Sequence, residues 1–101
     1  MSDRTGTIVR AKAGRDRGGL FCVVGEDREK GLLLLANGKR RRAARPKRKK
    51  PAHVETLDCR FDHPAIQKLK QGEALTDKEL RRALAAFRDQ FGGMTLWQKT
   101  T

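Results

Sequence analysis

Cysteine, aromatic residues and long apolar runs are all scarce in this chain of 101 residues. Its two cysteines, Cys22 and Cys59, are far apart and form no C-x-x-C pair, which excludes a disulfide framework and a cysteine zinc site. The longest apolar run, residues 32–36, is too short for a membrane span or for a signal peptide. We therefore expect a protein of a reducing, intracellular compartment, with a cytoplasmic location and no membrane partner.

Catalytic and cofactor motifs are also missing. Neither His53 nor His63 has a second ligand at metal-binding spacing, and no G-x-x-x-x-G-K-[ST] nucleotide loop occurs. We expect a non-catalytic protein with no metal and no cofactor. Aromatic residues make up 5% of the chain and none is tyrosine. A protein that stacks single-stranded bases needs exposed aromatic rings, so folded RNA is the expected target, with single strands reached by Trp97 or Phe61 as the alternative.

Positive charge is abundant and lies almost entirely in the first half. The net charge is +12, and residues 1–52 hold 16 Lys and Arg against 5 Asp and Glu. Residues 53–101 hold 8 against 7, which is nearly neutral. Such a balance favours a polyanionic partner, with nucleic acid first and an anionic membrane surface second.

Residues 6–25 form a compact pattern of two apolar stretches around a basic loop. Residues 7–9 and 20–24 are rich in β-branched and apolar side chains, which predicts two strands of a hairpin. The loop between them, residues 10–19, carries four cations, and its three glycines allow a tight bend close to a partner. We expect Asp16 in this loop to be a turn residue that accepts hydrogen bonds from nearby backbone amides, with a neighbouring arginine as a second option.

This stretch, VRAKAGRDRGGLFCVVG with its flanks, resembles a KOW motif, with Gly14 as the motif glycine. Among KOW proteins it resembles small bacterial KOW-domain RNA-binding proteins, which are similar in turn to KOW-bearing large-subunit ribosomal proteins. The resemblance implies a mainly β fold, a small SH3-like (KOW) barrel, whose loop contacts RNA.

The chain up to residue 57 supplies three further candidate strands for that barrel. Residues 31–36 read as a buried strand, and Asn37-Gly38 as a hairpin turn into an edge strand at residues 39–43. Residues 45–51 contain two prolines in a block of like charge, so we expect an extended, mobile basic arm. Residues 53–57 then form the last strand and close a barrel domain over residues 1–57.

Residues 58–93 change to a helical pattern. Asp62 or His63 can cap a first short helix that begins at Pro64 and ends at Gly72. Thr76 and Glu79 form a capping box for a second helix, which Gly92-Gly93 ends. Its apolar stripe (Leu80, Ala83, Leu84, Phe87, Phe91) is expected to pack on the first helix and the barrel, with a protein partner for helix 76–91 as the alternative. Residues 94–101 form a tail that contains Trp97.

Together these features predict a non-catalytic RNA-binding protein that grips phosphates. Arginine suits this task because its planar guanidinium can contact two phosphate oxygens at once. The setting that the resemblance implies is the ribosome, with ribosomal RNA or another translation-associated RNA as partner. Two alternatives stay open: a protein-interaction module on the transcription machinery, and nonspecific nucleic-acid packing by the arm. The expected RNA-binding residues are Arg10, Lys12, Gly14, Arg15, Arg17, Lys39, Arg40, Arg41, Arg42, Arg45, Lys47, Arg48, Lys49 and Lys50.

Overall fold

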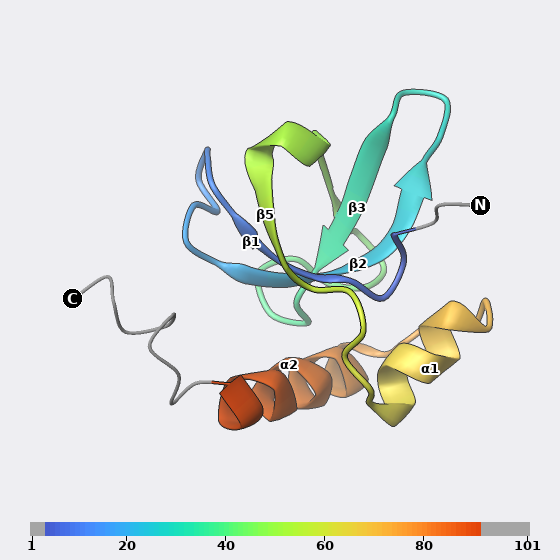
Figure 1. Ribbon diagram of the computed structural model, residues 1–101. Helices are drawn as coiled ribbons and strands as arrows, with labels where there is room; N and C mark the ends of the chain where they lie inside the picture. Colours follow the sequence, from blue (N-terminus) through green and yellow to red (C-terminus); the bar gives the residue numbers. More distant parts are fainter. Residues whose placement is uncertain (1–3, 92–101) are drawn as a thin grey trace.

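The computed structural model describes residues 4–91, which form a five-stranded antiparallel sheet followed by two helices (Figure 1). The strands are β1 (Ile8–Ala11), β2 (Leu20–Asp27), β3 (Leu32–Ala36), β4 (Lys47–Lys49) and β5 (Val54–Asp58). A single 3₁₀ turn, η1 (Pro51–His53), joins β4 to β5. The helices are α1 (Pro64–Lys70) and α2 (Asp77–Phe91), and both lie under one face of the sheet.

The long strand β2 lies at the centre of the sheet, whose order is β4-β3-β2-β1-β5. Cys22 of β2 faces Ile8 of β1 on one side and Ala36 of β3 on the other. The register shifts once between β1 and β5 and once between β2 and β3. Such bulges bend a strand and increase its twist, which accounts for the strong curl of the sheet in Figure 1.

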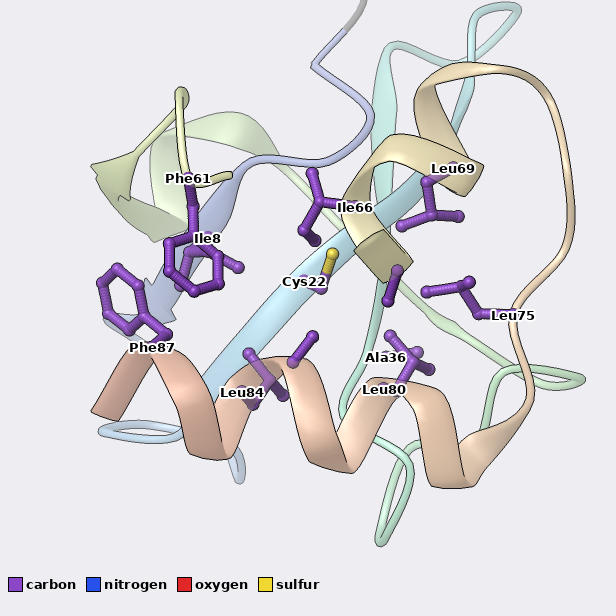
Figure 2. Packing of buried hydrophobic residues seen from close by; sticks show 12 residues of the cluster. Ile8, Cys22, Ala36, Phe61, Ile66, Leu69, Leu75, Leu80, Leu84 and Phe87 are labelled. Carbon is purple, nitrogen blue, oxygen red and sulfur yellow. The ribbon is translucent and has the colours of Figure 1, made fainter. Parts of the chain in front are cut away.

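Alternation along the strands creates a hydrophobic cluster on each face of the sheet, because successive side chains point to opposite sides. Val9, Phe21 and Leu35 belong to the cluster inside the curl. Their neighbours Ile8, Cys22 and Ala36 belong to the cluster that packs against the helices (Figure 2). Cys22 is fully buried in this second cluster, as a small apolar side chain would be.

Both helices begin at the residues that the sequence indicates. The His63 side chain accepts a hydrogen bond from the Ala65 amide, and Pro64 occupies the first helical position of α1. In the capping box of α2, the Thr76 amide donates to Glu79 Oε1 and the Glu79 amide donates to Thr76 Oγ1. The apolar stripe of α2 points at the sheet and α1, as Figure 2 shows for Leu80, Leu84 and Phe87, so the expected packing is confirmed.

Two sequence predictions between residues 37 and 51 are wrong. Residues 39–43 are not a strand, because the Asn37 side chain accepts hydrogen bonds from the amides of Lys39 and Arg41 and turns the chain back on itself. Residues 37–46 thus form a wide loop. Residues 45–51 are not a free arm either, since they contain β4, which pairs with β3 and places Lys49 opposite Leu33. The predicted helix stop at Gly92-Gly93 and the tail with Trp97 lie outside the described residues.

Candidate nucleic-acid interface

The loop between β1 and β2, residues 12–19, is a tight non-helical turn that projects from the sheet (Figure 1). Gly14 and Gly18 have φ angles of 80° and 85°, a region that favours glycine. The Gly18 amide donates to the Ala11 carbonyl at 2.8 Å, and the Lys12 amide donates to the His53 carbonyl at 2.8 Å. These bonds fix one end of the loop to η1 and the other end to β1.

The three cationic side chains of this loop are exposed, whereas its one carboxylate is buried and paired. Lys12, Arg15 and Arg17 are exposed and form no ion pair with any residue in the range 4–91. Asp16 is buried, and its Oδ2 accepts from Arg41 Nε at 3.1 Å and Nη2 at 2.9 Å. Asp16 is thus paired with an arginine, but with Arg41, 25 residues away, rather than with a sequence neighbour, and the expected bonds from nearby amides to the carboxylate are absent. As a result, Asp16 does not offset the exposed charges of its own loop.

Lys49 of β4 makes a second contact with the loop of residues 12–19. Its side chain is buried and its Nζ donates to the Ala13 carbonyl at 2.8 Å. A lysine can bury its aliphatic stem while the ammonium reaches a polar partner. Arg41 and Lys49 therefore hold the loop of residues 12–19 in place from two sides.

The other predicted site residues differ in how far their charge is available. Two arginines are engaged on the sheet surface, since Arg10 Nη2 lies 2.6 Å from Glu55 Oε1 and Arg48 Nε lies 3.3 Å from Asp27 Oδ2. Lys47 is half-buried. The exposed members without an ion pair in the described part of the chain are Lys12, Arg15, Arg17, Lys39, Arg40, Arg42, Arg45 and Lys50.

Two side chains of α2 hold the loop of residues 37–46 in place. Asp77 Oδ1 accepts from the Ala43 amide at 2.7 Å, and Arg81 Nη1 donates to the Gly38 carbonyl at 2.8 Å. Gly38 has a φ of 81°, and a Cβ there would clash with the Asp77 carbonyl oxygen. Asp77 and Arg81 have no role assigned from the sequence, because both contacts join segments far apart in the chain.

Three of the four described phenylalanines, at positions 21, 61 and 87, are buried and are not available for base stacking. Phe61 is buried and meets Phe87 edge-on, with ring centroids 5.3 Å apart. Phe21 is buried inside the curl of the sheet. The alternative in which Phe61 reaches single-stranded RNA is therefore wrong, while Trp97 lies outside the described residues.

Among residues 4–91, three titratable groups have clearly displaced pKa values, and none belongs to this surface. Burial raises the pKa of the Cys22 thiol to about 12. The Lys68–Glu79 pair, with Nζ 2.6 Å from Oε2, links α1 to α2. The hydrogen bond between them raises the pKa of Lys68 and lowers that of Glu79. Within residues 4–91 no three His, Cys, Asp or Glu side chains gather where they could hold a metal ion.

Comparison with known proteins adds no assignment: no family model matches the chain, and no curated protein matches it. Neither helix in the described part of the chain has the length and apolar character needed to cross a membrane.

Proposed function

We propose that this protein is a non-catalytic RNA-binding protein that docks the loops of residues 12–19 and 37–46, together with Lys50, on the phosphate backbone of structured RNA. The observation that carries the proposal is the inward position of Asp16. Its pairing with Arg41 leaves Lys12, Arg15 and Arg17 as exposed, uncompensated cations on a loop of fixed shape. Groups fixed before binding lose less conformational entropy when they engage a ligand.

Backbone recognition of folded RNA fits this surface better than base reading does. Arginine side chains can each bind two phosphate oxygens, and the exposed set contains arginines from both loops. The phenylalanines at positions 21, 61 and 87 are buried in the core, so they offer no stacking platform. Double-stranded RNA is recognised mostly by shape and by its sugars and phosphates, which requires cations at fixed spacing rather than exposed rings.

The finer description of the fold that accompanies this proposal is an SH3-like KOW barrel. It is supported by the antiparallel order of consecutive strands, by the return of β5 to pair with β1, and by the glycine-bent basic loop between β1 and β2. Under that description Gly14, at a φ of 80°, is the motif glycine. Ribosomal RNA, or another RNA of the translation apparatus, is the partner that the KOW resemblance implies.

The two alternatives receive less support from the contacts. A protein-interaction module that uses the apolar stripe of α2 needs that stripe exposed, but Leu80, Leu84 and Phe87 are buried against the sheet and α1. Nonspecific packing by a free basic arm needs residues 45–51 to be unstructured, but they contain β4 and the start of η1.

A binding titration with a matched charge control tests the proposal. Arg15→Gln with Arg17→Gln removes two loop cations, while Lys30→Gln with Lys70→Gln removes two exposed cations from the β2–β3 turn and the end of α1. We expect the loop variant to lower affinity for a hairpin RNA and to reduce the slope of log affinity against log salt by about 2, since each lost phosphate contact removes about one unit. The control should bind like the wild type.

Equal losses in both variants would show attraction by net charge alone and would overturn the docking model. Crosslinking the protein to RNA in cells and sequencing the bound fragments then identifies the RNA. The expected result is enrichment at structured ribosomal or other translation-associated sites, and a uniform background without peaks contradicts that partner.

A further inference from the structure

The solvent face of α2 carries a stripe of cations opposite its apolar stripe. Lys78, Arg81, Arg82 and Arg88 follow one another at helical spacing and are all exposed. Residues three and four apart lie next to each other on a helix surface, so these side chains form one row. Ala85 lies within the row and contributes only a methyl group. The helix surface is therefore hollowed at Ala85, with cationic side chains before and after it along the row.

The loop of residues 37–46 turns this row into a groove of about 440 Å³. Lys39 lies on the loop side of the groove, and the four α2 cations and Ala85 lie on the helix side. The loop side is fixed, because Gly38 accepts from Arg81 and Ala43 donates to Asp77. The cations on the two sides are thus held facing a shared space.

No carboxylate lines the groove among the described residues. The acidic side chains of α2 are directed elsewhere or lie outside it. Asp77 accepts from the Ala43 amide, and Glu79 accepts from Thr76 and Lys68. Asp89 is exposed and is not part of the groove lining. Five cations therefore face the groove without an acidic counterpart, which gives a strongly positive potential that draws in anions.

We infer that this groove is a second phosphate-binding site, in which the backbone of the bound RNA continues from the loop of residues 37–46 onto α2. The inference rests on the proposed function and extends it to a helix whose charged residues the sequence analysis did not select. Hydrogen bonds join the two loops and α2 into one surface. The loop of residues 37–46 is bonded to the loop of residues 12–19 through Arg41 and Asp16, and to α2 through Gly38 and Arg81.

Arg82 and Arg88 are the residues to change, because neither forms an ion pair within residues 4–91 and neither supports the fold. Arg81 is left intact, since it holds the Gly38 carbonyl. Glutamine replaces each arginine because its helix propensity is similar. The control is the Lys30→Gln, Lys70→Gln variant, which removes the same charge from residues outside the groove. Urea midpoints equal to that of the wild type show that each variant is folded.

The experiment measures affinity for a hairpin RNA over a range of salt concentrations. We expect R82Q/R88Q to bind about tenfold more weakly than the control, as the loss of two exposed charge contacts predicts. The slope of log affinity against log salt should fall by about 2. The loss should be the same for hairpins of different sequence, because phosphate contacts carry no sequence information.

The outcomes separate this inference from the proposed function. If the wild type binds and R15Q/R17Q weakens binding while R82Q/R88Q matches the control, the groove is not a phosphate site and the loop proposal stands. If R82Q/R88Q alone weakens binding, the groove binds phosphate without the loop of residues 12–19, and the proposed docking of that loop is wrong. If the wild type does not bind hairpin RNA at all, both are wrong.

Discussion

Replacing Arg41 with methionine tests whether the pair between Asp16 and Arg41 holds the loop in its binding shape. The substitution keeps an unbranched apolar stem and removes the guanidinium with its charge. Asp16 has only 3% of its side chain exposed, and its Oδ1 has no hydrogen-bond partner among the described residues. Arg41 is therefore its whole compensation, and the R41M variant leaves a buried carboxylate unpaired.

The cost follows from the geometry of the pair. At 2.9 Å between Nη2 and Oδ2 the Coulomb attraction is about 6 kcal/mol with an effective dielectric constant of about 20. Part of this attraction is offset by desolvation, and Arg41 keeps 28% of its side chain exposed. Breaking a buried pair costs about 3–5 kcal/mol, so we expect the lower end, about 3 kcal/mol of unfolding free energy.

Urea unfolding followed by circular dichroism measures this loss, and Arg42 provides the matched control. Arg42 is the neighbouring exposed arginine, so Arg42→Met removes the same charge and should cost less than about 0.5 kcal/mol. Adding Asp16→Asn to R41M removes the buried charge and should restore part of the stability. Equal stability of R41M and R42M, or no recovery in the double variant, would refute the reasoning.

Three further predictions concern the scaffold. Gly38→Ala should lower the free energy of unfolding more than Gly31→Ala does. Both positions have positive φ, which costs an alanine about 1 kcal/mol, but only at Gly38 would the new Cβ also clash with the backbone of Asp77. Urea titration of both variants measures the difference. Burial raises the pKa of the Cys22 thiol to about 12 from its ordinary 9.0. The contribution of this thiol to the free energy of unfolding is therefore complete below pH 9.0 and is lost as the pH rises toward 12, and Cys22→Ala should flatten that alkaline loss. A thiol reagent at neutral pH should label only Cys59 of the folded protein. Thr76→Ala should lower the free energy of unfolding by about 1 kcal/mol, because α2 loses its N-terminal cap. A melting temperature equal to that of the wild type would contradict the capping box.

Local patterns in the sequence predict most of the secondary structure correctly. The strands around the basic loop, the run at residues 32–36 and both helix starts depend on neighbouring residues alone. His63 with Pro64, and Thr76 with Glu79, are signals of this kind because the hydrogen bonds that they make are local.

The basic segment could not be predicted in the same way, because long-range contacts determine its shape. Asn37-Gly38 is a common hairpin turn, yet Asp77 and Arg81 hold the following residues as a loop. Residues 47–49 carry only charge, yet they pair with β3 because their backbone completes its ladder. The inward position of Asp16 likewise depends on Arg41, 25 residues away.

The central claim is that the fixed basic loops, rather than net charge spread over the surface, dock on RNA. An NMR titration of the labelled protein with a hairpin RNA tests it most directly, because each backbone amide reports its own surroundings. The account predicts that the largest shift changes fall on residues 12–19 and 37–46 and on Lys50. Changes confined to the β2–β3 turn and α1, or an absence of changes at any residue, would contradict it.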